Sequence, residues 1–526
     1  MKYSLVALAP IFAGLSHAAS SDDWASRSIY QVITDRYHRS SDSDAPCNIT
    51  NYCGGTWNGI TENLDYIQNM GFTAIQISPV NLNINSTTIY GQAFHGYWQT
   101  SLYDLNPNFG SGDDLKKLSS ELHKRNMYLL VDVVASEMAV DIGNHNMTSS
   151  TKIDYSAFAP APFNKESSYN PYCPIIDWQN VTEYQDCWLG YTGVATPDIR
   201  TDDKEVAAAL GTWIKELVSN YSIDGIRVDG SKQITYDFFN DFVDAAGVYP
   251  LGEVEDGDPK FVCNYQKYTE GLENYPVYYT TVQAFTAGKM PGLISHVLPL
   301  TMMMRLSPQM QWLSLSLQMV SPNTTTDKNS ISRVNTPLST VKPSGKNNPS
   351  TTSTLYTLTA TLNTIRNHAI SINSNYVANS SILLHTDDST YASRKGPNGV
   401  QIVSILSNQG SKGGKYTLAI DKAADPGTNL TEVVTCTSYV ANNNGTIYVE
   451  LNKGEPRVLF PTFQMNGTGI CGFNKDASAG TGTATSTATG TGSAASATSS
   501  KKGAASGLKV SEWVFAGAGL LALALL

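Results

Sequence analysis

The sequence of 526 residues has no cluster of basic side chains. It contains 35 Lys and Arg against 45 Asp and Glu, a formal net charge of −10, and no stripe rich in Lys or Arg. Proteins that bind nucleic acid concentrate such residues on one face, so we expect no nucleic acid as a partner. An acidic, soluble surface suits a neutral polymer as the ligand.

No apolar run reaches the ~20 residues of an ordinary membrane span. Residues 1–19 have the features of a secretory signal: Lys2, an apolar run from Leu5 to Leu15, and Ser16-His17-Ala18 as the cleavage context. Ten Asn-x-Ser/Thr sequons, from Asn48 to Asn466, agree with secretion. We therefore expect a secreted protein.

Aromatic side chains are absent from residues 476–506, which are almost entirely Ala, Ser, Thr and Gly. This composition predicts a flexible stalk that cannot bury an apolar core. Small residues from Gly503 to Ser506, a polar spacer and the apolar tail Val514 to Leu526 then follow the pattern of a GPI-attachment signal. Residues 507–526 would be removed, and only a lipid anchor would contact the membrane, at the cell surface or cell wall. The alternative is a single transmembrane anchor, for which the tail is short.

Two short β-branched runs each end on a carboxylate. Gly225 to Asp229 is one, and Val248 to Glu253 is the other. Consecutive barrel strands that end on acids bring both to the same open end of the barrel, where barrel enzymes hold their active sites. Two facing carboxylates are what a retaining glycosidase needs. Arg227 precedes Asp229 by two residues, so it points to the same side of the strand, where it can keep Asp229 ionised.

Residues 20–376 alternate short apolar strands with amphipathic helices, which predicts an α/β fold with a (β/α)8 barrel. The expected strands are Ser28–Thr34, Phe72–Ser78, Met127–Val134, Gly225–Asp229 and Val248–Glu253, and the expected helices include Asp113–Arg125 and Lys204–Ser219. Residues 377–475 change to alternating strands and predict an antiparallel β module; its expected strands are Val400–Leu406, Tyr416–Ile420, Thr446–Leu451 and Val458–Phe460.

The chain resembles the fungal α-amylases of glycoside hydrolase family 13, closest to their GPI-anchored α-glucanotransferase group. Six stretches carry the resemblance: SIYQVITDRY from Ser28, CGGTW from Cys53, DYIQNMGFTAIQISPV from Asp65, YGQAFHGYW from Tyr90, LVSNYSIDGIRVD from Leu217 and RKGPNGVQIVSILSN from Arg394. The resemblance implies a TIM barrel with a small B domain at about 142–200 and a C-terminal β-sandwich. It also implies α-1,4-glucan or maltooligosaccharide as the substrate, and we expect a monomer.

The resemblance also implies residue roles. Asp229 matches the nucleophile and Glu253 the general acid/base, so Glu253 should have a raised pKa while Asp229 stays ionised. Asp132 matches a structural position at the top of the barrel. The implied substrate contacts are Arg227, Trp98, Tyr97, His95, Lys232 and Gly257.

The family's calcium ligands are altered in this chain. Asp198 is kept, but Ser136 stands where the family has Asn, Gln185 where it has an acid, and Gln233 where it has His. Calcium prefers several anionic oxygens, so we predict a weak site or none. Glu137 replaces a histidine that contacts substrate at the −1 subsite. This replacement, with the anchor signal, is what resembles the glucanotransferase group.

Seven cysteines in an oxidising compartment should pair. The pattern of the fungal amylases implies the bridges Cys47–Cys53, Cys173–Cys187 and Cys436–Cys471. Cys263 is then left unpaired, because the cysteine that joins it in the family is missing.

Acidic residues are nearly absent between Glu273 and Asp387, where Asp327 is the only one, and half of the twelve methionines fall between Met290 and Met319. The family completes its barrel here and supplies a third catalytic carboxylate, which Asp327 does not match. The segment of about 287–350 is either translated across a frame or splice error, or belongs to a barrel that is incomplete at its last strands. The sequence thus predicts a hydrolase or a glucan transferase, and alternatively a catalytically impaired glucan-binding surface protein.

Overall fold

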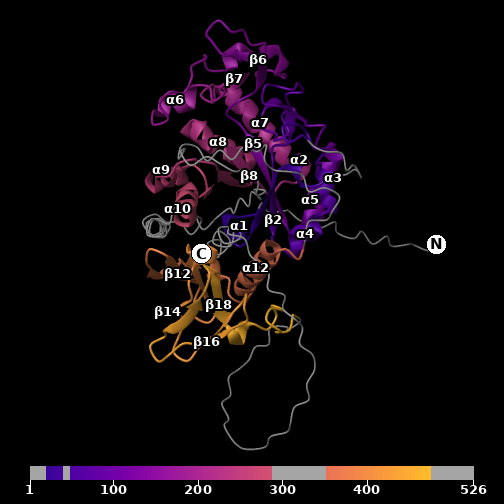
Figure 1. Cartoon of the computed structure of the whole chain (residues 1–526). Coiled ribbons are helices and arrows are strands. Elements are labelled where there is room, and N and C mark those ends of the chain that lie inside the picture. Colours follow the sequence, from indigo (N-terminus) through magenta and orange to yellow (C-terminus); the bar gives the residue numbers. More distant parts are fainter. Residues whose placement is uncertain (1–18, 40–47, 287–350, 476–526) are drawn as a thin grey trace, which may run out of the picture.

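The computed structural model describes residues 19–39, 48–286 and 351–475 (Figure 1). Residues 1–18 of the predicted signal, the segment 287–350, the stalk and the anchor tail lie outside the described residues. Among the described helices none combines the length and hydropathy that a bilayer crossing requires.

Six parallel strands form the central sheet in the order β1-β2-β5-β8-β9-β10, which is also their order in the chain. Their bounds are β1 Ile29–Val32, β2 Ala74–Ile77, β5 Tyr128–Val134, β8 Gly225–Asp229, β9 Tyr249–Gly252 and β10 Gly271–Leu272. Parallel neighbours joined through helices are the arrangement of an α/β barrel, so the predicted fold class is confirmed. The predicted loss of the last strands falls on segment 287–350, outside the described residues.

Helices cover the outer side of this sheet (Figure 1). The principal ones are α3 Trp57–Glu62, α4 Leu64–Asn69, α5 Gly112–Lys124, α7 Lys204–Tyr221 and α8 Tyr236–Ala246. In α7, the residues Val206, Leu210, Trp213, Ile214 and Leu217 are buried at helical spacing. Asp203 caps the start of the helix, and its carboxylate accepts hydrogen bonds from two backbone N–H groups of the first turn.

An insertion between β5 and β8 rises above the barrel (Figure 1). It contains the antiparallel pair β6 Val140–Asn146 and β7 Tyr191–Ala195, and the short helix α6 Val181–Asp186. The disulfide Cys173–Cys187 closes a loop within it, and this is a pair that the resemblance implies. The insertion lies on the side of the sheet where the strands end, so it borders the open end of the barrel.

The C-terminal module is antiparallel throughout. One sheet has the order β11-β12-β13-β18-β15-β16 and a second sheet pairs β14 with β17. The bounds are β11 Ile382–Thr386, β12 Thr390–Lys395, β13 Ile402–Ser407, β14 Tyr416–Ile420, β15 Asn429–Glu432, β16 Ser438–Val440, β17 Ile447–Leu451 and β18 Arg457–Pro461. In β17, Ile447, Val449 and Leu451 are buried and the residues between them are exposed, as expected for one sheet of a sandwich. Cys436 is bonded to Cys471 in this module.

Helix α12, Thr354–Ile372, joins the barrel to the C-terminal module (Figure 1). The half-buried Arg366 donates from Nη1 to the carbonyl of Ser26 at 2.9 Å, before β1. On the other side, His368 Nε2 lies 2.7 Å from the carbonyl oxygen of Gln464. Contacts on both sides fix the two parts against one another.

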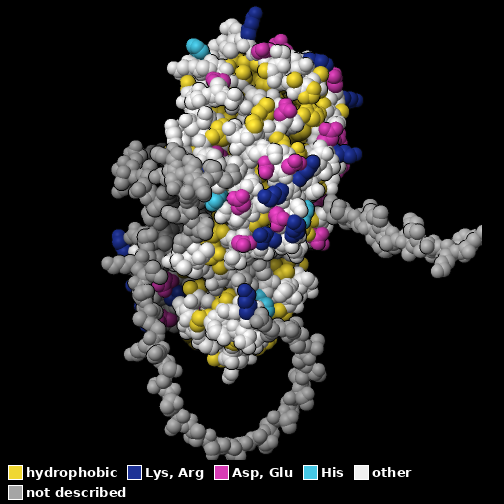
Figure 2. All heavy atoms as spheres, turned by 90° about the vertical axis from the view of Figure 1, so that its right-hand side faces the viewer, with side chains coloured by type: hydrophobic (Ala, Val, Ile, Leu, Met, Phe, Trp, Pro, Cys, Tyr) yellow, Lys and Arg dark blue, Asp and Glu magenta, His cyan; other side chains and the backbone are white. Residues whose placement is uncertain are grey.

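Figure 2 shows one face of the molecule, on which Lys and Arg side chains are interspersed with Asp and Glu. Side chains of both signs therefore lie side by side on this face.

Candidate active site

Three consecutive strands end on acidic residues at the same level of the sheet. In the register of the parallel sheet, Val228 lies opposite Gly252, and Gly252 lies opposite Leu272. The next residues along the three strands are Asp229, Glu253 and Glu273, so the carboxylates are neighbours at the carboxyl edge. The structure therefore brings together Asp229 and Glu253, as the sequence predicts, and adds Glu273.

Arg227 connects these carboxylates. Its Nη1 donates to Asp132 at 2.9 Å and also to Asp229. Its Nη2 lies 2.6 Å from Glu253 Oε1 and 3.3 Å from Glu273 Oε2. The guanidinium is thus a buried cation among four carboxylates, and a planar fork can hold several of them at fixed angles.

Exposure divides the four carboxylates into two kinds. The side chains of Asp229 and Glu253 keep 25% and 19% of their surface exposed. Those of Asp132 and Glu273 keep 1% and 9%. Only the first pair is open enough to touch a substrate, whereas the second pair surrounds Arg227 from inside.

Glu253 is held by several hydrogen-bond donors. The backbone N–H of Gly230 donates to Oε2 at 2.9 Å, and the Tyr275 hydroxyl donates to Oε1 at 2.7 Å. The side chain of Asp229 also hydrogen-bonds Glu253. Burial raises the pKa of Glu253, but Arg227 and these donors outweigh burial, so the pKa lies below its ordinary value.

Asp229 has the opposite shift. Burial and the charge of Glu253 raise its pKa well above the ordinary value, against the opposing effect of Arg227. The sequence-based assignment, with Glu253 raised and Asp229 kept ionised by Arg227, is therefore wrong for this arrangement. The physical reason is that Glu253 accepts from more donors than Asp229 does, so ionisation is more favourable at Glu253 than at Asp229.

The predicted aromatic residues border the same site. The Tyr97 hydroxyl donates to Asp132 Oδ2 at 2.7 Å. His95 stacks against Tyr97 and meets Trp98 edge-on, with ring centroids 5.8 and 4.6 Å apart. Burial lowers the pKa of His95 to about 4, so its ring is neutral near pH 7.

Lys232 and Gly257 lie on the loops that follow β8 and β9. The ammonium group of Lys232 is 3.3 Å from Asp256 Oδ2, and the side chain is buried. Gly257 is exposed. Lys232 therefore ties the two loops together at the open end of the barrel.

Of the four positions that match the family's calcium ligands, Ser136 and Gln233 lie close to Gly230. The Ser136 Oγ is buried and has no hydrogen-bond partner among the described residues. Asp198 accepts from Asn170 at 2.8 Å, and burial raises its pKa well above the ordinary value. The side-chain amide of Gln185 donates to the Ile234 carbonyl at 3.0 Å.

These donors fit a calcium ion poorly. Asp198 is the only carboxylate among the four positions, since Ser136, Gln185 and Gln233 are neutral. Gln185 already bonds the loop after β8 directly, through an N–H that cannot bind a cation. No group of three or more His, Cys, Asp or Glu side chains in the described part of the chain is arranged to hold a metal. The α-amylase family generally binds calcium, and the predicted weakening of this site remains a prediction.

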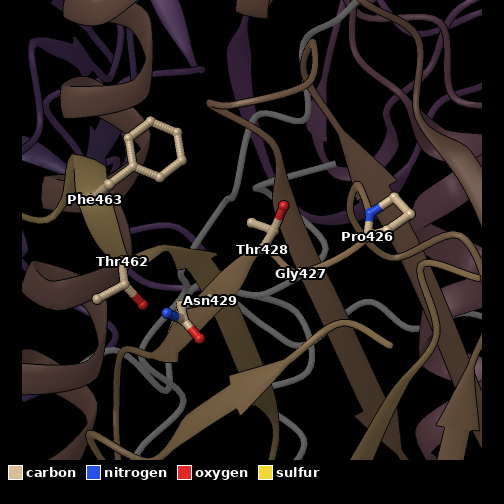
Figure 3. A pocket seen from close by; sticks show the side chains of 6 residues that line it. All are labelled: Pro426, Gly427, Thr428, Asn429, Thr462 and Phe463. Atoms are coloured by element: carbon tan, nitrogen blue, oxygen red, sulfur yellow. The ribbon is translucent and has the colours of Figure 1, made fainter. Parts of the chain in front are cut away.

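A pocket of about 430 Å³ lies on the C-terminal module, away from the carboxylates (Figure 3). Figure 3 shows Phe463 and Pro426 on opposite sides of the pocket, with polar side chains between them. Its lining residues are Pro426, Gly427, Thr428, Asn429, Thr462 and Phe463. None of them can transfer a proton near neutral pH, so this pocket is not the catalytic centre.

The sequence did not predict two residues of this site, the carboxylate Glu273 and the hydroxyl donor Tyr275. The rule that found Asp229 and Glu253, a strand that ends on an acid, applies equally to Glu273. Strand β10 has only two residues, Gly271 and Leu272, so it gives no periodic signal. Tyr275 follows two residues later, at the start of helix α10, Tyr275–Thr286.

Comparison with protein families supports the same interpretation. Residues 31–317 match the model described as "Alpha amylase, catalytic domain", and residues 383–479 match "Alpha-amylase, domain C". The chain belongs to the α-amylase family. The α-amylase 2 of Schwanniomyces occidentalis is 38% identical over 501 residues, covering 89% of this chain and 97% of that protein. The α-amylase 1 of Lipomyces kononenkoae is 40% identical over 482 residues, covering 85% of this chain and 76% of that protein.

Solved α-amylase structures share the fold. The α-amylase from Malbranchea cinnamomea superposes with a TM-score of 0.76 at 34% identity, covering 86% of this chain and 100% of that one. Both the barrel and the C-terminal module therefore belong to this family's architecture.

The cysteine that the sequence leaves unpaired, Cys263, is a half-buried free thiol in the described structure. Cys47 lies outside the described residues, so the Cys47–Cys53 bridge remains a prediction.

Proposed function

We propose that this protein is a retaining enzyme acting on α-1,4-glucans, with Asp229 as nucleophile and Glu253 as general acid/base. The observation that carries the proposal is the convergence of these two partly exposed carboxylates, on adjacent strands, around the buried Arg227. Family membership supports the choice of α-glucan, since the relatives bear the name α-amylase.

The chemistry begins with one proton transfer. The mechanism needs one proton on the hydrogen-bonded Asp229–Glu253 pair, and the donors around Glu253 favour the arrangement with that proton on Asp229. Its transfer to Glu253 along their hydrogen bond leaves an ionised nucleophile and a protonated acid. A bound sugar must also separate the two carboxyl groups, because retaining enzymes hold them ~5 Å apart.

The reaction then follows two displacements. Asp229 attacks the anomeric carbon while Glu253 gives its proton to the glycosidic oxygen, and the glycosidic bond breaks. Glu253, now ionised, removes a proton from water or a sugar hydroxyl, which attacks the glycosyl-enzyme and frees Asp229. Water gives hydrolysis, and a sugar hydroxyl gives transfer.

Substrate contacts are proposed for the residues around this centre. Arg227 positions both carboxylates, and Tyr97, His95 and Trp98 offer aromatic surface to the apolar face of a glucose ring. Lys232 and Gly257 would line the open end on the β8 and β9 loops.

Transfer and hydrolysis are distinguished by the length of the products. Purified protein is incubated with a single maltooligosaccharide and the products are separated by chromatography, with Glu253→Gln as the inactive control. Products longer than the substrate indicate glucan transfer, which the replacement of a −1 subsite histidine by Glu137 favours. Shorter products alone indicate hydrolysis.

A catalytically impaired glucan-binding protein is the second candidate, and the missing third carboxylate favours it. Binding of the maltooligosaccharide without any change in its length would support this candidate and refute the enzyme.

We further propose that the protein is a monomer, binds calcium weakly or not at all, and is secreted and held at the cell surface by a GPI anchor.

A further inference from the structure

Glu273 lies in the active site although the proposed mechanism does not use it. It follows β10 directly, and its backbone N–H donates to the Gly252 carbonyl at 3.0 Å, immediately before Glu253. This bond fixes the two glutamates side by side on neighbouring strands. The Glu273 side chain is buried and lies beside the buried Arg227.

Glu253 and Glu273 share one donor. Arg227 Nη2 is 2.6 Å from the first and 3.3 Å from the second, so the guanidinium favours Glu253 in this arrangement. Nη2 carries two N–H groups, so it can donate to both carboxylates at once, and the shorter contact is the one to Glu253. The two carboxylates therefore lie beside the same cation, and the negative charge of each opposes ionisation of the other.

We propose that Glu273 is a positioning residue that promotes the protonated, general-acid form of Glu253. Ionised Glu273 places a second negative charge beside Glu253 and shares with it the positive charge of Arg227. Both effects make ionisation of Glu253 less favourable. The proposal rests on the function proposed above for Glu253.

Each strand near Glu273 contributes a charged or titratable group to its surroundings. Arg227 on β8 is the cation, and Glu253 after β9 and Asp132 on β5 are the anions. Tyr275, after β10, donates to Glu253. Burial raises the pKa of Glu273 to about 7 against the opposing effect of Arg227, so Glu273 changes charge in the range where the enzyme would work.

The first test compares Glu273→Gln, which keeps the shape and removes the charge, with Glu273→Asp, which keeps the charge. The alkaline limb of the kcat/KM profile on a maltooligosaccharide reports loss of the proton shared by the Asp229–Glu253 pair. We expect Glu273→Gln to move this limb to lower pH by about one unit, so that kcat/KM at pH values above the limb falls roughly tenfold. Glu273→Asp should restore part of the shift. A limb that stays in place in Glu273→Gln contradicts the proposal.

The second test does not depend on turnover. A carboxyl group whose folded pKa is raised loses its stabilising contribution as pH rises from the unfolded towards the folded pKa. Wild type should therefore lose stability between about pH 5 and about pH 8, whereas Glu273→Gln should not lose this contribution. The Tm of the variant minus the Tm of wild type should increase by about 3 °C over that range. A constant Tm difference refutes a charged, titrating Glu273.

Glu255→Gln is the matched control. Glu255 is an exposed carboxylate on the same loop side, accepting from the Tyr279 hydroxyl at 2.9 Å. Neither the pH profile nor the pH dependence of its Tm should change. If no form of the protein alters maltooligosaccharides, the proposed function fails, and the Tm comparison alone then decides the role of Glu273.

Discussion

At the scale of single residues, Arg227 balances four carboxylates with one charge. Asp132, Asp229, Glu253 and Glu273 cannot all be ionised beside one buried guanidinium, so protons must be retained. Burial raises the pKa of Asp132 to about 6, partly offset by Arg227. The protonation of the site is therefore a property of the whole cluster and not of each acid.

Replacing Arg227 by Met should expose this dependence. Removing the partner of buried anions costs about 3–5 kcal/mol, and we expect that loss in the free energy of unfolding near pH 8. Without the guanidinium the folded-state pKa values rise further, and a raised folded pKa means stability that is present at low pH and lost as pH increases. The loss should therefore be smaller near pH 5. Urea denaturation at both pH values measures it.

Arg200→Met provides the comparison for this prediction. Arg200 pairs with Asp202 at 3.0 Å on the surface, with both side chains exposed. An exposed pair contributes about 0–1 kcal/mol, so this variant should change little at either pH. Equal losses in the two variants would mean that Arg227 is an ordinary ion-pair partner.

At the scale of elements, the strands and helices that could be predicted from the sequence are those long enough to show an apolar periodicity. Strand β5 and helix α7 have strong apolar patterns, and both lie where expected. Strand β10 was missed because two residues have no period, and with it Glu273. The pKa order of Asp229 and Glu253 was predicted incorrectly, because it depends on the Gly230 N–H and the Tyr275 hydroxyl, which only the folded chain brings to Glu253.

The junction between α6 and the loop after β8 gives a second prediction. Gln185 joins these elements by a direct hydrogen bond to Ile234. We therefore expect the Tm of wild type to change little when millimolar Ca²⁺ is added or a chelator removes it. Gln185→Glu restores an anionic oxygen at a position where the family has an acid, so its Tm should rise with Ca²⁺, because a ligand that binds only the folded state stabilises it.

Differential scanning calorimetry with and without Ca²⁺ measures both proteins. Gln185→Ala is the control, since it removes the hydrogen bond without adding charge and should lose stability without gaining a calcium response. A large calcium-dependent Tm in wild type would contradict the predicted weak site.

At the scale of the whole molecule, the described structure joins a barrel, an inserted lobe and a C-terminal module into one body. Helix α12 fixes the module beneath the barrel through Arg366 and His368 (Figure 1). The module ends at its disulfide Cys436–Cys471, shortly before the predicted stalk. The stalk and the anchor signal are predicted from composition alone. For segment 287–350, a frame or splice error and an incomplete barrel both remain as explanations of its composition.

The anchor prediction concerns the full chain in its cell. Treatment of intact cells with a phosphatidylinositol-specific phospholipase should release the protein into the medium, because a GPI anchor holds it only by its lipid. A chain truncated after residue 506 should be secreted without treatment. Retention of the full chain after phospholipase treatment, with release only by detergent, would favour the transmembrane alternative.

The central claim is that Asp229 and Glu253 act on one anomeric carbon. A fluorinated maltosyl fluoride, which forms a glycosyl-enzyme that breaks down slowly, tests it by peptide mass spectrometry. The account predicts a maltosyl mass on the peptide that contains Asp229, its absence in Asp229→Asn, and slower release in Glu253→Gln. A folded protein that carries no label, or carries it on another carboxylate, would contradict the account.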